Sequence, residues 1–434
     1  MSLGVVAIIG SPNVGKSTLF NRIVGSRSAI VDNTPGITRD RLYRKATWLT
    51  KDFYLIDTGG IELKNRPFQE EIRAQAEIAI KEADLIIFVT DAKLGLTGDD
   101  KLVARMLYKS KKPVILAVNK VDSIEKIDEA SEFYALGLGD PLPISSEHGI
   151  GVGDLLDKVV KMLPKKKDKD YKNAIKFSII GRPNVGKSTL VNALVGENRV
   201  IVSNISGTTR DATDTEFTHD KQNYVVLDTA GLKKRGKIFE SIDKYSALRT
   251  LKAIDRADIA LFLIDASVGI TEQDKHVVGY AHDAHKAIIF LVNKWDIKKK
   301  EFEANSFIKE VKKQFKFLDY SNVLFISALK RSNIEKIFKE IKETHESFNK
   351  RIKTSVLNDV ILDAVQMNES PDFKGGRLKV YYAEQISVAP PTFVLFVNNP
   401  SYAHFSYLRY LENRLREAFS YQNVPLKLVL RRKN

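Results

Sequence analysis

The sequence predicts an α/β protein: two domains of mostly parallel sheet sandwiched by helices, followed by a small α+β domain. Three observations lead to this prediction. Short runs rich in Val, Ile, Leu and Phe alternate with amphipathic segments, which is typical of parallel strands buried on both faces. A long stretch of sequence repeats itself once, at an offset of 171 residues. The C-terminal segment contains none of the repeated motifs.

The apolar runs give the expected strands of each copy. In the first copy these are residues 5–9, 53–57, 85–90 and 114–119, and in the second they are residues 177–180, 224–228, 259–265 and 287–293. The C-terminal segment reads helix, strand, strand, helix, strand, over residues 355–367, 378–382, 393–397, 405–419 and 426–430.

The domain boundaries follow from the repeat and from one charged stretch. Residues 1–164 form the first domain, residues 174–349 the second, and residues 350–434 the C-terminal domain. Residues 165–173 are short, charged and almost free of apolar side chains, which indicates a solvated linker. The apolar N-terminus has no basic leader or cleavage pattern, so it is expected to be the first buried strand.

Composition narrows the class of protein. The 434 residues include 43% apolar residues and no cysteine, which excludes disulfides and thiolate metal sites. No apolar stretch reaches the roughly 18 residues of a membrane helix, and we expect a cytoplasmic monomer. The net charge of +15 indicates a polyanionic partner or a lysine-rich solubilising surface.

Each copy begins with a phosphate-binding loop that follows an apolar strand and opens a helix, the context that the motif requires. The glycines let backbone N–H groups converge on phosphates at a helix N-terminus. Lys16 and Lys187 are expected to reach the terminal phosphates, and Ser17 and Ser188 to bind Mg²⁺. The expected loop residues are Gly10, Ser11, Pro12, Asn13, Val14, Gly15, Lys16 and Ser17, and Gly181, Arg182, Pro183, Asn184, Val185, Gly186, Lys187 and Ser188.

The base is predicted to be guanine. An Asn-Lys-x-Asp sequence follows a buried strand in both copies, and its carboxylate can accept from the guanine N1–H and amino group together. Adenine has no such donor pair, so a buried acceptor facing it stays unpaired. The predicted base-reading residues are Asn119, Lys120, Asp122 and Ser145, and Asn293, Lys294, Asp296 and Ser327.

Two further motifs are predicted to sense the γ-phosphate. Asp57 and Asp228 end strands and would hold Mg²⁺, and Thr38 and Thr209 would touch Mg²⁺ and the γ-phosphate only in the triphosphate state. The backbone N–H groups of Gly60 and Gly231 would contact the γ-phosphate. The catalytic candidates are therefore Lys16, Thr38, Gly60, Lys187, Thr209 and Gly231. The remaining nucleotide-binding candidates are Thr58, Gly59, Ile61, Thr229, Ala230 and Leu232.

Many GTPases orient the attacking water with a glutamine after the last switch glycine. Here that position holds Ile61 in one copy and Leu232 in the other, and neither side chain can orient water. We therefore expect slow intrinsic hydrolysis, or help from another group. The two copies also differ in charge after this position: residues 233–237 are basic, whereas residues 62–66 combine acidic, basic and uncharged side chains. This difference suggests that the second switch reports to RNA or to a neighbouring domain.

These tandem loops, the repeated Thr-Arg-Asp switches and the C-terminal segment resemble the Der/EngA family of bacterial GTPases over nearly the whole chain. The resemblance implies two Era-like GTPase domains, a KH-like domain, and a role in large ribosomal subunit assembly with contacts to ribosomal RNA. It also implies that Asn13 and Asn184 hold a stimulating potassium ion. Two alternatives are a GTPase of tRNA modification, whose family uses a C-terminal cysteine absent here, and a membrane-surface GTPase, supported only by charge.

The C-terminal segment departs from the usual RNA-binding KH pattern. Its only glycines, Gly375 and Gly376, are adjacent, so the GxxG loop that clamps a nucleic-acid backbone cannot form. The tail residues 431–433 can contact phosphate or stay solvated. Four aromatic residues at helical spacing allow base stacking or, as we favour, core or interdomain packing: Tyr402, Phe405, Tyr407 and Tyr410.

Overall fold

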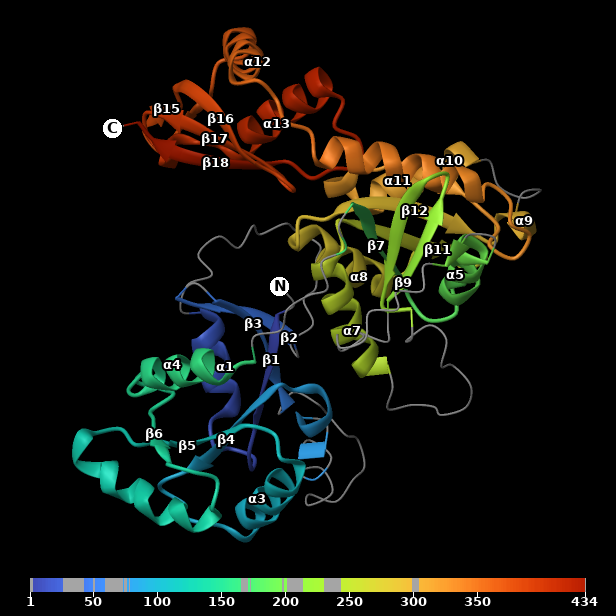
Figure 1. Ribbon diagram of the computed structural model, residues 1–434. Coiled ribbons are helices and arrows are strands. Elements are labelled where there is room, and N and C mark those ends of the chain that lie inside the picture. The colour runs from blue at the N-terminus through green and yellow to red at the C-terminus, as the bar shows by residue number, and fades with distance from the viewer. Residues whose placement is uncertain are drawn as a thin grey trace. The chain divides into compact units, whose positions relative to one another are not determined.

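The computed structural model describes residues 3–25, 43–49, 51–58, 73, 76–77, 79–164, 171, 173–196, 199–200, 214–229, 243–298 and 304–433 (Figure 1). The chain divides into two compact units, residues 1–169 and residues 170–434. No helix among these described residues is long and apolar enough to cross a membrane.

The first unit is built on a six-stranded sheet in the order β2-β3-β1-β4-β5-β6. All neighbouring strands are parallel except the edge strand β2, which runs antiparallel to β3. The four strands expected from apolar runs are present, and β2 and β6 add to them. The bounds are β1 Gly4–Ile9, β2 Tyr43–Trp48, β3 Lys51–Asp57, β4 Leu85–Asp91, β5 Val114–Asn119 and β6 Leu142–Pro143.

Helices pack on this sheet through buried aliphatic side chains. One core joins Ile8 of β1 and Ile87 of β4 to Leu19 of α1 and Leu155 of α4, all fully buried. A capping box at Thr97 and Asp100 starts α3, so its first backbone N–H groups are paired. The helices are α1 Lys16–Gly25, α3 Gly98–Ser110, the 3₁₀ segment η2 Ile124–Leu136 and α4 Val152–Met162.

The second unit repeats this plan in a seven-stranded sheet of order β13-β12-β11-β7-β10-β9-β8. The central strands are parallel, and β8 and β9 form an antiparallel edge. The expected strand 224–228 ends one residue early, because Asp228 adopts a left-handed backbone with φ 59°. The bounds are β7 Ala174–Ile180, β8 Arg199–Val200, β9 Thr215–His219, β10 Gln222–Leu227, β11 Ile259–Asp265, β12 Ala287–Asn293 and β13 Val323–Phe325.

Helices cover both faces of this second sheet. One core includes Leu190 of α5 and Ile337 of α11, and a separate core includes Val278 of α8 and Val311 of α10. The helices are α5 Lys187–Val195, α7 Asp243–Arg256, α8 Glu272–Asp283, α9 Trp295–Lys298, α10 Ala304–Gln314, the 3₁₀ turn η3 Lys316–Leu318 and α11 Ile334–Phe348.

The C-terminal domain has the predicted order of two helices and three long strands. Its sheet runs β16-β17-β18, with β16 antiparallel and β18 parallel to β17. The expected strand 378–382 was placed too early, since β16 continues to Val388, and the hairpin β14–β15 was not predicted. The bounds are α12 Thr354–Met367, β14 Asp372–Phe373, β15 Gly376–Arg377, β16 Val380–Val388, β17 Pro391–Val397, η4 Pro400–Tyr402, α13 Phe405–Phe419 and β18 Lys427–Arg432.

The aromatic residues singled out in the sequence mostly pack inside this domain. Tyr407 is buried, and its hydroxyl donates to the carbonyl of Asn368 at 2.9 Å. The Tyr410 hydroxyl donates to the carbonyl of Ala364, also at 2.9 Å. Both tyrosines therefore join α13 to α12, as the packing interpretation expects, whereas Phe405 is 76% exposed at the start of α13.

One buried residue, Asn423 in the turn between α13 and β18, makes several of the hydrogen bonds between the C-terminal domain and the second α/β domain. Its carbonyl accepts from Ile288 N–H at 2.9 Å, and its own N–H donates to the Tyr320 carbonyl at 3.2 Å. Its side chain accepts from Asn322 N–H at 2.6 Å and donates to Thr344 at 2.9 Å. The two domains also share one hydrophobic core within residues 170–434.

Candidate nucleotide-binding sites

Both predicted phosphate loops lie where a strand ends and a helix begins, after β1 and after β7 (Figure 1). In the first loop, the Lys16 ammonium donates to the carbonyls of Gly10 at 2.9 Å and Ser11 at 2.8 Å. In the second, Lys187 donates to Gly181 at 2.6 Å and to the next carbonyl at 2.6 Å. Each lysine is thus held across the mouth of its own loop, ready to meet phosphate oxygens.

Two glycines of each loop cannot be replaced by a larger residue. Gly15 has φ 95°, and a Cβ there would lie 2.2 Å from the Asn119 side chain. Gly186 has φ 101°, and its Cβ would lie 2.4 Å from the Asn293 side chain. A Cβ at Gly10 or Gly181, the first glycine of each loop, would lie 2.1 Å or 2.6 Å from a backbone carbonyl oxygen. The glycines therefore permit both the backbone conformation and the close approach of the base-reading segment.

The asparagines of the base-reading motifs connect three segments. The Asn119 amide donates to the Val14 carbonyl at 2.7 Å, and its carbonyl oxygen accepts from Ser146 N–H at 2.8 Å. In the second domain, Asn293 donates to Val185 at 2.9 Å and accepts from Ala328 N–H at 2.9 Å. Each asparagine is buried, so it fixes the phosphate loop relative to both loops that would surround the base.

The predicted guanine acceptors are oriented by serines. The first carboxylate, Asp122, accepts from Ser145 at 2.8 Å and from Lys93 at 2.8 Å, and these bonds, led by that from Lys93, hold its pKa below the usual range. In the second domain a hydrogen bond from Ser327 is the main cause of a lowered pKa at Asp296. Both carboxylates are therefore ionised acceptors at neutral pH.

Two pairs of functional residues were missed from the sequence. Asp91 and Asp265 are the last residues of β4 and β11 and form ion pairs with the motif lysines, Lys120 at 2.5 Å and Lys294 at 2.6 Å. Burial raises the pKa of Asp265, but hydrogen bonds led by that from Lys294 outweigh it and leave the pKa lowered.

A second repeated carboxylate supports the phosphate loop. Asp100 accepts from Ser11 at 3.2 Å, and Asp274 lies 3.6 Å from Arg182 at the matching loop position. Burial raises the pKa of Asp274. Comparing the two copies at the offset of 174 residues, which also relates the base-reading motifs, shows that both kinds of aspartate recur.

Two of the three predicted Mg²⁺ ligands of the first domain, Ser17 and Asp57, lie together. The Ser17 hydroxyl donates to the Asp57 carboxylate at 3.0 Å, and Asp57 is largely buried. Next to it, the Thr58 hydroxyl donates to the Ile8 carbonyl at 2.6 Å and is fully buried. A hydroxyl beside a carboxylate is the oxygen donor set that suits Mg²⁺ together with waters and phosphate oxygens.

The second domain surrounds its equivalent aspartate differently. The backbone N–H of Asp228 donates to Asp214 at 3.1 Å. The same Asp214 carboxylate pairs with Arg256 of α7 at 2.5 Å and accepts from the Tyr171 hydroxyl at 2.6 Å. Residue Tyr43 occupies the repeat position equivalent to Asp214, so the first domain has no carboxylate at this position.

Several predicted residues lie outside the part of the chain that the structure describes. They are the switch threonines Thr38 and Thr209, the segments Gly59, Gly60 and Ile61 and Ala230, Gly231 and Leu232, and the following residues 62–66 and 233–237.

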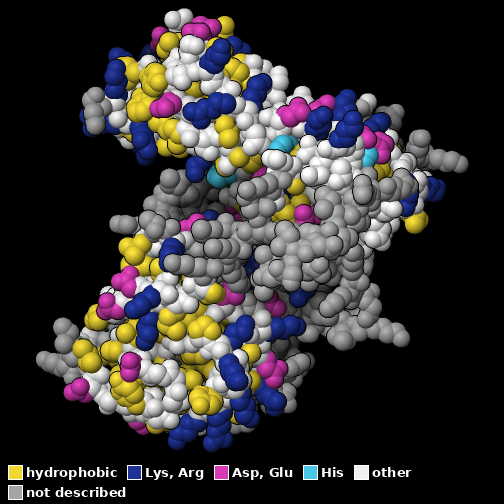
Figure 2. Space-filling view, viewed as in Figure 1, with side chains coloured by type: hydrophobic (Ala, Val, Ile, Leu, Met, Phe, Trp, Pro, Cys, Tyr) yellow, Lys and Arg dark blue, Asp and Glu magenta, His cyan; other side chains and the backbone are white. Residues whose placement is uncertain are grey.

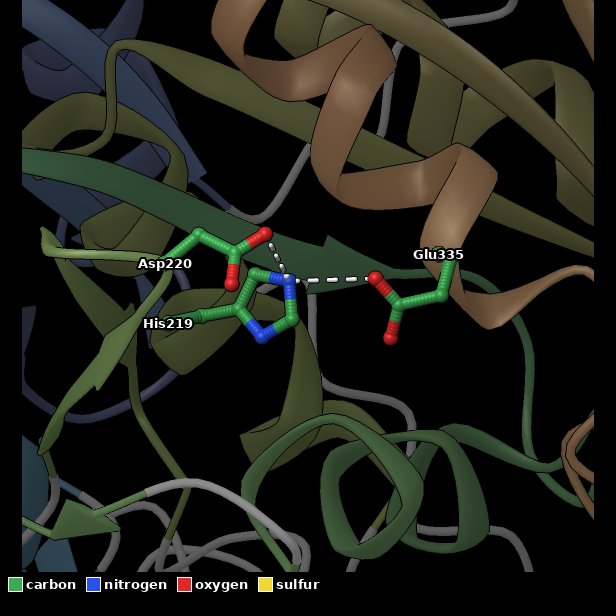
Figure 3. Close-up of side chains that lie close together, drawn as sticks. All are labelled: His219, Asp220 and Glu335. Carbon is green, nitrogen blue, oxygen red and sulfur yellow. Dashed lines mark ion pairs between the residues drawn. The ribbon is translucent and has the colours of Figure 1, made fainter.

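One cluster of metal-ligating type occurs among the described residues (Figure 3). The His219 Nε2 lies 3.1 Å from Glu335 and 3.5 Å from Asp220. Asp220 and Glu335 are 91% and 76% exposed, and the His219 ring stacks on Phe338. His219 pairs with Gln222, the first residue of β10, whereas Asp228 directly follows the last residue of this strand. The ion-pair cluster is therefore separate from the nucleotide residues.

The chain matches two protein families. Residues 5–120 and 176–294 match a family described as 50S ribosome-binding GTPase. Residues 351–431 match the family described as the KH-domain-like C-terminal domain of EngA bacterial GTPase enzymes. The matched segments contain both phosphate loops and the Asn-Lys pair that opens each base-reading motif.

Curated relatives match the full length. Proteins called GTPase Der from Staphylococcus saprophyticus subsp. saprophyticus and Staphylococcus aureus (strain JH9) are each 55% identical over 436 aligned residues, which cover 100% of both chains. Among solved structures, Era in complex with MgGDPNP and nucleotides 1506–1542 of 16S ribosomal RNA is 21% identical. That likeness covers 60% of this chain and 94% of the other, with a TM-score of 0.31.

Proposed function

Because this chain belongs to the Der/EngA family of GTPases, we propose that its two nucleotide sites form a GTP-controlled switch in assembly of the large ribosomal subunit. The chain is a GTP hydrolase that binds guanine nucleotides. The observation that carries the proposal is the duplicated constellation of phosphate loop, asparagine tie and guanine acceptor, in a family described as binding the 50S subunit.

At each site, different groups of the chain are proposed to bind the base and the phosphates of the nucleotide. The base-reading carboxylates, Asp122 and Asp296, fix the guanine, while loop N–H groups and the ammonium groups of Lys16 and Lys187 neutralise the phosphates. Bound Mg²⁺ would supply further positive charge to neutralise the phosphates. We assign it to Ser17, Thr38 and Asp57 in the first domain and to Ser188, Thr209 and Asp228 in the second.

Hydrolysis would then release the switch segments. The threonines Thr38 and Thr209 and the glycines Gly60 and Gly231 are proposed to contact the γ-phosphate, so its departure frees the segments that carry them. We further propose that the chain acts as a monomer of three domains, with boundaries at residues 164, 174 and 350, and that the segment 165–173 links the first two.

We propose that potassium replaces the missing water-orienting glutamine. Asn13 and Asn184 sit at the same position of the two loops and share a left-handed backbone, with φ 63° and 65°. This shared geometry supports one role for both side chains. GTPase rates several-fold higher in KCl than in NaCl are expected, and substituting both asparagines by alanine should remove the difference. Equal wild-type rates in the two salts would contradict the potassium assignment.

The proposed cellular role is tested by sedimentation with purified large ribosomal subunits. The chain loaded with a non-hydrolysable GTP analogue should co-sediment with large subunits more strongly than the GDP-loaded chain, and this binding should weaken as salt rises. Small subunits and anionic lipid vesicles serve as controls. Binding to vesicles but not to large subunits, or equal binding to the two subunits, would contradict the proposal.

A further inference from the structure

The sheet of the C-terminal domain has one covered face and one open face. Helices α12 and α13 cover the first face, where Leu357 and Leu411 share a core with Leu395 of β17. Side chains alternate along a strand, so the residues between the core positions point to the other face. The described residues of β16, β17 and β18 therefore present a second set of side chains away from the helices.

An aromatic and cationic row crosses this open face. Tyr382 of β16 pairs across the strands with Phe396 of β17, and Phe396 pairs with Arg431 of β18. The two rings lie 5.7 Å apart between centroids, at 42°. Tyr382 is 42% exposed and Arg431 is exposed, so a ring face and a guanidinium are both open to a ligand.

Positive charge surrounds the row. Lys427 lies on the same side of β18 as Arg431, and the ammonium of Lys433 lies 4.9 Å above the ring of Tyr381, which is 45% exposed. The acidic residue on this side of β16 is Glu384, so the face keeps a positive balance. Figure 2 shows hydrophobic side chains lying among lysines and arginines over the strands of this domain.

We infer that this open sheet face binds single-stranded RNA, with bases stacked on Tyr382 and Phe396 and phosphates held by Arg431, Lys433 and Lys427. Aromatic side chains framed by cations are the surface by which sheet domains hold unpaired bases and a phosphate backbone. The inference deepens the proposed function, because it names the RNA-contacting surface of a domain that lacks a GxxG loop.

Charge and ring geometry favour RNA over a protein ligand. Lysine is depleted in protein-docking patches, whereas here the exposed Lys427 lies on the same side of β18 as Arg431. The cation–π contact of Lys433 with Tyr381 also keeps one ammonium beside an exposed ring. Both features suit a ligand that alternates flat bases with phosphates.

The test measures binding of a fluorescein-labelled 12-residue oligoadenylate to the full chain loaded with GDP, by fluorescence anisotropy. Replacing Tyr382 by Leu, which keeps apolar bulk but cannot stack, should weaken binding roughly fivefold to 150-fold. Tyr382→Phe should restore binding. As the matched control, Phe405→Leu removes another exposed ring of the same domain and should leave affinity unchanged.

The charges are tested by the salt dependence of the same titration. Arg431→Gln and Lys433→Gln should each weaken binding and lower the slope of log K against log salt by about 0.7. Lys374→Gln is the matched control, because Lys374 also lies over a ring, that of Phe373 at 5.5 Å, but on the β14–β15 hairpin. An unchanged slope in both test variants would overturn the inference.

Sedimentation with large subunits separates this inference from the proposed function. If Tyr382→Leu loses large-subunit binding but keeps oligoadenylate affinity, the face contacts protein and the inference fails while the function stands. If it changes neither, the face is unused and the inference again fails. If wild-type chain binds oligoadenylate through this face but never binds large subunits, the inference stands and the proposed function fails.

Discussion

At the scale of single residues, the two sites are built by buried polar groups that make several bonds each. Asn119 and Asn293 illustrate this, since each uses its amide and its carbonyl oxygen to join separate loops. The sequence predicted these asparagines as nucleotide-binding residues. Their role as ties between loops does not follow from the sequence, because no spacing rule says which carbonyl a buried amide will meet.

Replacing Asn119 by Ala should weaken nucleotide binding at the first site. The change removes two buried hydrogen bonds and leaves Val14 C=O and Ser146 N–H unpaired, which costs about 2 kcal/mol or more, roughly 30-fold in affinity. Titration with a fluorescent GDP derivative in a Lys187→Ala background reads the first site alone. The control is Asn349→Ala at an exposed position. Unchanged affinity would show that the tie is dispensable.

Guanine recognition should not depend on pH between about 5.5 and 8. Hydrogen bonds from Lys93 and Ser327 lower the pKa of Asp122 and Asp296 respectively. Because the pKa is lowered, each carboxyl group is ionised at every pH above its usual pKa of 3.8. It becomes protonated only as pH falls through the lowered pKa. GDP affinity measured across this range should stay within about twofold. A tenfold fall between pH 8 and 6 would reveal a different titrating group.

At the scale of elements, the two copies differ around the second metal aspartate. One buried carboxylate, Asp214 at the start of β9, contacts the backbone of Asp228, Arg256 of α7 and the tyrosine just before β7. The first domain has Tyr43 and Glu82 at the positions of Asp214 and Arg256. The same chemistry is thus supported by different surroundings in the two domains.

Replacing Asp214 by Asn should weaken Mg²⁺-dependent GDP binding at the second site by roughly tenfold and leave the first site unchanged, because Arg256 loses its buried charge partner. Tyr171→Phe removes one hydrogen bond and should cost only a few-fold. Each site is read in a background that silences the other, with Lys16→Ala or Lys187→Ala. The control, Asp258→Asn, breaks a separate ion pair with Lys176. Equal losses at both sites would indicate general destabilisation instead.

The turn at Asn423 should hold the C-terminal domain in place. Asn423→Gly keeps the left-handed backbone, φ 60°, but removes the side-chain bonds and should cost about 2–4 kcal/mol of docking. Asn423→Ala adds backbone strain of about 1 kcal/mol. Hydrogen exchange should rise at Ile288 and Asn322, whose N–H groups it accepts from. The exposed neighbour variant Gln422→Ala should match wild type, and unchanged exchange in Asn423→Gly would contradict the docking role.

At the scale of the whole molecule, the repeat and the apolar runs were enough to predict the fold class and most central strands. The antiparallel strands Tyr43–Trp48 and Thr215–His219 were missed because their sequences are largely polar and contain no continuous apolar run. The shared core of the second α/β domain and the C-terminal domain was also missed. A single asparagine in a turn carries no periodic signal, so the docking could not be predicted from the sequence.

The claim that this chain carries two complete guanine-nucleotide sites is tested most directly by counting bound nucleotide. Equilibrium titration of the full chain with GDP and Mg²⁺ should give two molecules bound per chain. Lys16→Ala and Lys187→Ala should each leave one, and the double variant none. A wild-type stoichiometry of one, or a single substitution that abolishes all binding, would contradict the account.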